Sequence, residues 1–514
     1  MKCKISILFF AQLFYVYVFA NVKPASPFGD HMVFQRDMKV PVWGMADAVE
    51  KVTVTFSNQK IITIADASGN WKIELAKLSA GGPYIMTITG KNTITINDIY
   101  IGEVWVCSGQ SNMDMTVARE DRYWAGVFNE KEEVAAADYP TIRFFDVDFT
   151  PNEHFQNDVN GKWEIVSAQT VGHLSAAAYF FARDLQNKLK VPVGLITTAY
   201  GASTAEAWIR KEALLANQKF IYLVDTFQSK LDRYYTDTAA QIKYKAAYEK
   251  WKTDAAKAKA EGKDELRSPR NPDPAGDQHN PYVLWNGMVS PLVPYAIRGA
   301  LWYQGESNGP TAKIYKDLME TLINDWRKQW GQGNFPFIYV QLANHQNLVT
   351  EPVKEDAMVT VRDAQLQNLS IPNTAMVVAI DNADPNDPGN IHPKNKQEIG
   401  RRLAQSALGL VYSEKIIYSG PIYSKMTSEG NKVRIHFINT GGGLMAKGET
   451  LTGFAVAGSD KKFVWAHAVI DGNTVVVSSP EVPSPTVVRY GWSKNPPVNL
   501  YNKERLPASP FKTD

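Results

Sequence analysis

The sequence predicts an α/β domain with a parallel sheet, flanked by two β regions. Short runs that alternate between apolar and polar residues fill 21–100, strand-like and helical segments alternate over 101–410, and strand-like runs return over 411–514. Repeated strand–helix alternation is typical of a parallel sheet covered by helices on both faces. The length of 514 residues also favours several domains, because a single core rarely grows so large.

Residues 1–20 have the pattern of a secretory signal peptide. Two lysines precede a nearly unbroken apolar run at 5–19, which is short for a membrane span. We therefore expect an exported protein, periplasmic or secreted, that is not held in the membrane after signal cleavage. Only Cys107 would then remain, so no intrachain disulfide is expected.

The region 21–100 is predicted to be a small β-sandwich-like domain. Its alternating runs are separated by turns of Asp, Asn, Ser and Gly, as in "KVPVWGMA", "KVTVTFS", "GNWKIEL" and "YIMTITG". A second β domain is expected over 411–514, where runs such as "KVRIHFINT" and "NTVVVSS" occur.

The central region 101–410 contains the expected parallel sheet. After the strand that begins at 102, strands are predicted at 141–147, 193–200, 297–304, 335–343 and 375–381. Helices are predicted at 175–190, with Ser175 as N-cap, and at 315–330. Residues 236–281 begin with an Ala- and Lys-rich helix and end in a Pro- and Gly-rich loop, so they are interpreted as an inserted hairpin, either a lid or a structural decoration.

The composition excludes some classes of partner. The 55 basic and 53 acidic residues give a net charge of +2, which favours neither nucleic acid nor an anionic membrane surface. Nothing in the composition indicates an oligomeric state. No grouping of His, Cys and carboxylates has metal-ligand spacing, so we predict no catalytic metal and no cofactor.

Small and polar residues follow four of the predicted strands. They are Gly-Gln-Ser-Asn at 109–112, Gly-Ala-Ser-Thr at 201–204, Gly-Glu-Ser-Asn at 305–308 and a polar loop at 382–392. Function collects at the carboxyl ends of the strands in an open parallel sheet. These segments are therefore expected to share one crevice.

The residue types in this crevice suit a serine nucleophile, which needs a base, donors for an oxyanion and a group that orients the base. Ser111 lies at a tight strand–loop junction, where its own N–H can also face the crevice. Gly201 can bring a second N–H close because it has no side chain, and Asn308 offers an amide. Of the eight histidines, His392 alone follows an α/β strand in a loop that leads directly into a helix, which makes it the expected base.

Four segments, in this order along the chain, resemble the SGNH hydrolase superfamily, and more closely the sialate O-acetylesterase-like carbohydrate esterases. They are "GQSNM", "YGASTAEAW", "WNGMVSPLVPYAIRGALWYQGESN" and "IHPKNKQEIGRRLA". The flanks "PFGDHMVFQRDMKVPVWG" and "LPASPFKTD" are also similar, so the resemblance covers nearly the whole mature chain. It implies a flavodoxin-like parallel sheet in the central domain and a serine acyl-enzyme mechanism.

The resemblance also assigns roles. Ser111 becomes the nucleophile, His392 the general base, and Gly201 and Asn308 join the Ser111 N–H as oxyanion donors. Glu306 is interpreted as a buried carboxylate that braces the surrounding loops, not as a catalytic group.

The third triad member departs from the family pattern. The superfamily commonly places an Asp three residues before the His, where this chain has Gly389. The nearby acids are Asp387, Asp384 and Asp381. Asp387 is favoured as the acid that orients the imidazole, and the alternative is a backbone carbonyl that leaves a Ser–His dyad.

The sequence thus predicts an exported carbohydrate esterase that removes O-acetyl groups, with O-acetylated sialic acids as the substrate that the resemblance favours. An acetylated polysaccharide such as acetylxylan is the alternative within the same class. The alternative from another class is a catalytically dead glycan-binding protein. The four residues Ser111, Gly201, Asn308 and His392 argue against it, because a binding module does not need them all.

Overall fold

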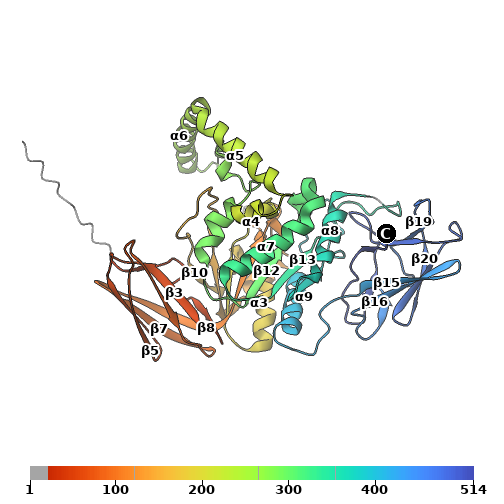
Figure 1. Cartoon of the computed structure of the whole chain (residues 1–514), viewed down its shortest axis with the longest axis horizontal. Coiled ribbons are helices and arrows are strands. Elements are labelled where there is room, and N and C mark those ends of the chain that lie inside the picture. Colours follow the sequence, from red (N-terminus) through yellow and green to blue (C-terminus); the bar gives the residue numbers. More distant parts are fainter. Residues whose placement is uncertain (1–20, 121, 264–265, 354) are drawn as a thin grey trace, which may run out of the picture.

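The computed structural model describes residues 21–120, 122–263, 266–353 and 355–514, so the predicted signal peptide at 1–20 lies outside the described residues. An N-terminal β region, a central α/β region and a C-terminal β region follow one another along the longest axis of the molecule, and two helices project from the central region (Figure 1). Within the described ranges, no helix combines the length and apolar character that a membrane crossing requires.

The N-terminal region contains two sheets whose inner residues share one core. In β3, β4 and β6, buried and more exposed residues alternate, as the period of a half-buried strand requires. β1, β3 and β6 form one sheet, and β5, β4 and β7 pair in the other. The strands are β1 (Lys23–Pro24), β2 (Val33–Gln35), β3 (Val40–Met45), β4 (Lys51–Phe56), β5 (Gln59–Ile64), β6 (Asn70–Leu75) and β7 (Gly81–Thr89).

A single strand, β8 (Thr93–Gly109), joins this region to the central sheet. Its first half pairs with β7 up to Ile101, and its second half pairs with β11 and β12 from Glu103 onward. The domain boundary predicted between 100 and 101 therefore falls inside a continuous strand. The N-terminal region is anchored directly to the strand that leads to Ser111.

The central sheet has the order β10-β9-β11-β8-β12-β13-β14. All neighbouring pairs are parallel except β10 with β9. The segment β11-β8-β12-β13-β14 has the flavodoxin-like order, so the predicted fold class is confirmed; β9 and β10 extend its edge. The remaining strands are β9 (Asp138–Asp146), β10 (Trp163–Ser167), β11 (Val193–Thr197), β12 (Gly299–Tyr303), β13 (Phe337–Gln341) and β14 (Thr374–Val378).

Helices cover both faces of this sheet because alternate residues of β8 point to opposite sides. Trp105 and Cys107 belong to the core beneath α3 and α9, whereas Val104 and Val106 belong to the core on the side of α7 and α8. The predicted N-cap is confirmed, since Ser175 Oγ accepts a hydrogen bond from the backbone N of Ala178 at 3.3 Å. The helices are α1 (Ser111–Asp114), α2 (Glu130–Ala135), α3 (Ala176–Leu189), α4 (Lys211–Leu215), α7 (Tyr315–Trp330), α8 (Ala357–Gln367) and α9 (Lys396–Leu410).

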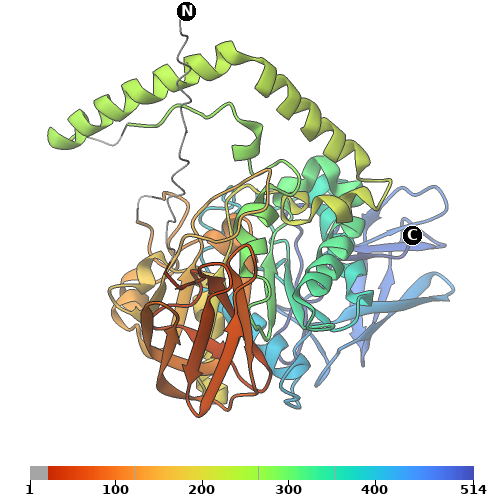
Figure 2. The same cartoon turned by 60° about the vertical axis from the view of Figure 1, so that its left-hand side comes forward.

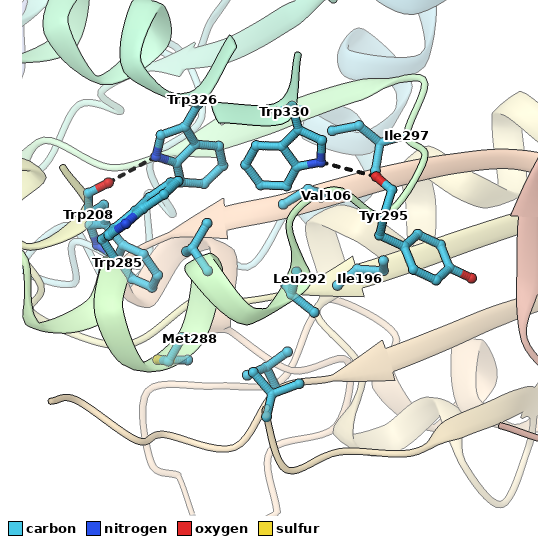
Figure 3. Close-up of a cluster of buried hydrophobic side chains, with 14 of the residues drawn as sticks. Val106, Ile196, Trp208, Trp285, Met288, Leu292, Tyr295, Ile297, Trp326 and Trp330 are labelled. Carbon is cyan, nitrogen blue, oxygen red and sulfur yellow. Dashed lines mark hydrogen bonds between the residues drawn. The ribbon is translucent and has the colours of Figure 1, made fainter. Parts of the chain in front are cut away.

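A cluster of tryptophans fills the core on the α7 side (Figure 3). Trp326 Nε1 donates to the carbonyl of Trp208 at 2.9 Å, and Trp330 Nε1 donates to the carbonyl of Tyr295 at 3.1 Å. Val106 of β8 lies beside this cluster. Each of these two indoles thus satisfies its polar atom while it fills apolar volume.

The predicted insertion is a helical arm that projects from the body of the molecule (Figure 2). It begins earlier than expected, with α5 (Ile221–Thr236), and continues in α6 (Thr238–Ala260). Its return segment rests on the loop after β11, because Gln278 Nε2 donates to the carbonyl of Gly201 at 3.4 Å. The base of the arm therefore borders the expected crevice.

The C-terminal region forms two four-stranded sheets and a two-stranded one, which pair as β15-β16-β21-β20, β19-β18-β22-β24 and β17-β23. The strands are β15 (Ile422–Glu429), β16 (Lys432–Ile438), β17 (Leu444–Ala446), β18 (Phe454–Ala457), β19 (Val464–Trp465), β20 (His467–Asp471), β21 (Thr474–Ser478), β22 (Val487–Tyr490), β23 (Leu500–Asn502) and β24 (Phe511–Lys512).

One buried guanidinium ties this region to the central sheet. Arg362 of α8 donates to the carbonyls of Leu342 and Ala343, which follow β13, at 2.9 and 2.6 Å. It also donates to the carbonyls of Ser493 and Lys494, which follow β22, at 2.7 and 2.9 Å. Since four carbonyls, most of them buried, depend on one side chain, its loss leaves several acceptors unsatisfied.

We predict that Arg362→Met lowers the thermal midpoint in scanning calorimetry by about 5 °C or more. The control is Lys461→Met, because that lysine side chain is 66% exposed and lies 3.8 Å from Asp514. It should change the midpoint by less than about 2 °C. Equal midpoints for the two variants would show that Arg362 does not hold the regions together.

Candidate active site

Strand β8 ends in a turn that requires glycine. Gly109 has φ +140°, and a Cβ at this position would lie 2.2 Å from the carbonyl oxygen of Tyr303 on β12. The next residue, Gln110, donates its backbone N–H to the same carbonyl at 3.0 Å. The turn places Ser111 as the first residue of the short helix α1, at the carboxyl end of the sheet.

The structure brings Ser111 and His392 together from 281 positions apart in the chain. The Nε2 atom of His392 lies 2.8 Å from Ser111 Oγ. His392 lies in the loop between β14 and α9, as the sequence indicated. This is the distance that a serine nucleophile and its general base would need, so the predicted roles of the two residues are geometrically possible.

The group that orients His392 is neither of those predicted. Asn390 Oδ1 lies 3.2 Å from His392 Nδ1 and accepts the backbone N–H of His392 at 2.9 Å. With Nε2 as the acceptor for the Ser111 hydroxyl, Nδ1 carries the hydrogen and donates to Asn390. Asp387 contacts Asn390 instead of the imidazole, since its Oδ2 accepts from Asn390 Nδ2 at 3.1 Å.

This arrangement corrects the choice of Asp387 as the direct partner of the base. The turn at 387–390 does return the chain toward the imidazole, with the N–H of Asn390 bonded to the carbonyl of Asp387 at 3.1 Å. That turn presents the side chain of residue 390, not that of residue 387, to the ring. The other acids serve elsewhere: Asp384 Oδ1 accepts the N–H of Asn386, and Asp381 pairs with Arg402.

His392 is packed between protein groups. The Trp124 ring lies 4.7 Å from the imidazole, centroid to centroid, and tilted by 35°. Burial, and then the nearby charge of Lys396, lower the pKa of His392 to about 4. The imidazole is therefore neutral near pH 7 and can accept a proton.

Gly201 lies beside Ser111, as predicted. A Cβ on Gly201 would come within 3.7 Å of both Ser111 Cβ and Asp114 Oδ2. Burial raises the pKa of Asp114, while Arg122 and the backbone N–H of Gly201 act in the opposite direction. The backbone N–H of Gly201 therefore faces the half-buried carboxyl of Asp114 next to Ser111, and its service to an oxyanion stays a prediction.

Asn308 occupies a different environment from the one expected. It is fully buried, and its Nδ2 donates to Glu206 Oε2 at 2.8 Å and to Thr311 Oγ1 at 2.9 Å. Its Oδ1 accepts from the backbone N of Ala205 at 2.9 Å and from Gln304 Nε2 at 2.6 Å. Both amide hydrogens are thus engaged inside the protein. An oxyanion role would require Asn308 to release one of these bonds.

Glu306 braces loops, as the sequence interpretation proposed, because its Oε1 accepts from Asn112 Nδ2 at 2.7 Å. Cys107 is fully buried, and burial raises the pKa of its thiol, so it is a core residue and not a nucleophile.

Sequence reasoning missed Asn390 and Trp124. Asn390 lies two residues before the base, in a Pro-Gly-Asn sequence that also reads as an ordinary turn. Trp124 lies in a loop of unremarkable composition, and only folding brings it to the imidazole. The only sequence signal for Asn390 was that a side-chain amide stands in the polar loop close to the expected base.

Comparison with known proteins accords with this geometry. The family described as "Carbohydrate esterase, sialic acid-specific acetylesterase" matches residues 101–245 and 284–409, which together make up more than half of the chain. The chain belongs to this family. It is therefore a carbohydrate esterase, and Ser111 and His392 both lie within the matched residues. The match omits 246–283, which includes most of α6 and the return of the arm.

Relatives of similar length support this assignment. A sialate O-acetylesterase from Rattus norvegicus is 30% identical over 436 residues, covering 78% of this chain and 76% of the relative. One from Homo sapiens is 28% identical over 535 residues, covering 95% of this chain and 91% of the relative. The crystal structure of a carbohydrate acetylesterase from Xanthomonas citri matches with a TM-score of 0.79 and 30% identity, over 96% of this chain and 99% of that chain.

For this esterase we predict that Asn390→Ala lowers kcat by about 100-fold, because the imidazole loses the acceptor that fixes its tautomer and orientation. Asp387→Asn should cost less than about tenfold, since an asparagine oxygen can still accept from Asn390 Nδ2. Steady-state kinetics on one acetyl ester measures both, with Asp384→Asn as the neighbouring control. A loss of about four orders of magnitude at Asp387 alone would instead indicate a direct triad.

We also predict that kcat/KM falls on the acid side of its pH profile, with a midpoint near pH 4. An ordinary histidine would place this acid limb near its pKa of 6.5. The base must be neutral, so activity is lost as pH falls through the pKa that burial lowers to about 4. Trp124→Ala, which admits water to the ring, should move the limb to higher pH. A wild-type limb near pH 6.5 would contradict the burial argument.

Proposed function

We propose that this carbohydrate esterase removes O-acetyl groups from O-acetylated sialic acids by a serine acyl-enzyme mechanism. The observation that carries the mechanism is the 2.8 Å contact between Ser111 Oγ and His392 Nε2 at the carboxyl end of the sheet. The substrate class rests on the family and on the sialate O-acetylesterase relatives.

In the first half-reaction, Ser111 Oγ attacks the carbonyl carbon of the acetyl ester while His392 Nε2 takes the hydroxyl proton. The backbone N–H groups of Ser111 and Gly201 are the proposed donors to the oxyanion. Collapse of the tetrahedral intermediate breaks the bond to the sugar oxygen. His392 returns its proton to that oxygen, so the sugar leaves as a free hydroxyl and the acetyl group stays on Ser111.

In the second half-reaction, water attacks the acetyl-enzyme. His392 takes a proton from the water, and the resulting intermediate releases acetate. The proton on His392 passes to Ser111 Oγ, which restores the starting state. Asn390 keeps Nδ1 protonated throughout by accepting its hydrogen bond at 3.2 Å.

Export is part of this proposal. The charged start and the apolar run at 5–19 are typical of a signal peptide, and export would bring the enzyme to extracellular or periplasmic glycans. Detection of the mature protein, lacking 1–20, outside the cytoplasm would support export; an uncleaved cytoplasmic chain would oppose it.

We predict that Ser111→Ala lowers kcat on p-nitrophenyl acetate by about 10⁴-fold or more, because no other group can form the acetyl-enzyme. Circular dichroism should show an unchanged fold. Ser428→Ala, an exposed serine of β15, is the control and should retain wild-type turnover. Near-normal activity of Ser111→Ala would contradict the assignment of Ser111 as the nucleophile.

The substrate class is tested on wild-type enzyme with O-acetylated sialic acids and acetylated xylan, by measuring released acetate. A higher kcat/KM on the sialic acids supports the proposal, and a preference for xylan assigns the polysaccharide esterase instead. If the enzyme hydrolyses none of these acetyl esters, the result favours the alternative of a catalytically dead glycan-binding protein.

A further inference from the structure

Three buried polar side chains beneath the Ser111–His392 pair take no part in the proposed chemical steps. They are Asn112 in α1, Glu306 just after β12, and Lys396, the first residue of α9 after β14. Asn112 and Lys396 are fully buried. A buried ammonium loses the solvation of water, and this cost is offset only by hydrogen bonds and opposite charge around it.

Asn112 follows the nucleophile directly and reaches the other two loops. Its Nδ2 donates to the carbonyl of Ile391 at 2.9 Å and to Glu306 Oε1 at 2.7 Å. Its Oδ1 accepts from Lys396 Nζ at 2.8 Å. One amide group, fixed to the backbone next to Ser111, therefore joins all three loops.

Lys396 completes the connection on the other side of the base. Its Nζ donates to the carbonyl of Pro393 at 2.7 Å and lies 5.7 Å from the centre of the Tyr303 ring. Ile391 and Pro393 are the residues on either side of His392. The carbonyl before His392 is thus held by Asn112 itself, and the carbonyl after it by Lys396, which is bonded to Asn112.

We propose that Asn112, Lys396 and Glu306 form a clamp that fixes His392 against Ser111 and sets the distance across which the proton moves. They are positioning residues, since they act through the loops and do not touch substrate. The inference rests on the proposed roles of Ser111 and His392. Its physical basis is that a base displaced by about 1 Å can lose about 100-fold in rate.

Charge gives the clamp a second effect. The groups that face the imidazole are the Ser111 hydroxyl, the Trp124 ring and the Asn390 amide, and the Lys396 ammonium acts on it through its charge. Beyond them, Arg122 lies over Trp124 and Asp387 binds Asn390.

Burial lowers the pKa of Lys396 to about 7, and Glu306 acts in the opposite direction. Lys396 is therefore protonated where His392, with a pKa of about 4, takes up its proton. Removal of the ammonium raises the pKa of His392, and the acid limb of activity moves to higher pH.

The test is Lys396→Met, assayed on p-nitrophenyl acetate across pH. We expect kcat to fall by about 100-fold, KM to stay within about threefold and the acid limb to rise by about one pH unit. Lys394→Met is the matched control, because it removes a lysine two positions earlier whose charge does not act on His392. A purely structural lysine would lower the thermal midpoint without moving the acid limb.

A second set of variants keeps the inference testable if Lys396→Met does not fold. Asn112→Ala should lower kcat by about 100-fold. Glu306→Gln, which keeps an acceptor for Asn112, should retain more activity than Glu306→Ala. Wild-type kcat in Asn112→Ala, or equal loss in both Glu306 variants, overturns the clamp. If wild-type enzyme itself hydrolyses no ester, the proposed function fails instead.

Discussion

The carboxyl ends of the parallel strands meet around β8, and the site depends on this constraint. β8 has β11 on one side and β12 on the other, so the loops after all three strands share one edge. The chain must cross over β8 between β11 and β12, which makes this edge a topological switch point where ligand sites form in such sheets. Ser111 and Gly201 face each other there because their strands are direct neighbours.

His392 does not receive its position from the strands in the same way. It follows β14, which is separated from β8 by β12 and β13, and a loop must carry it back to Ser111. Hydrogen bonds replace strand pairing over this distance. Asn390 fixes the ring, and Asn112 and Lys396 hold the flanking carbonyls. The loop that carries His392 is thus held by side chains instead of by a sheet.

The flanking β regions reinforce the same strands. β8 runs without interruption from the N-terminal region into the central sheet. On β8, the buried carboxylate of Glu103 pairs with Arg36 of the N-terminal region at 2.5 Å and with Arg298, just before β12, at 2.6 Å. On the opposite side, Arg362 ties the end of β13 to the C-terminal region. The Glu103 contacts lie at the amino end of the parallel strands and the Arg362 contacts at the carboxyl end of β13, so the flanking regions support the sheet from both ends.

The sequence by itself determined the elements and most of the site. Periodicity predicted α7 at 315–330 as observed, and the small residues after the strands predicted Ser111, Gly201 and His392 as neighbours. These inferences succeeded because they depend on local spacing and on the rule that parallel strand ends share an edge.

Only the tertiary structure decided which side chain faces which. It assigned Asn390 in place of Asp387 to the imidazole, engaged the amide of Asn308 in buried bonds, and brought Trp124 to the base. Spacing along a turn does not fix the direction of its side chains, and an amide binds whichever partners packing leaves nearest. Lys396 shows the same limit, because a lysine in a helical pattern is normally at the surface and only the folded loops surround this one.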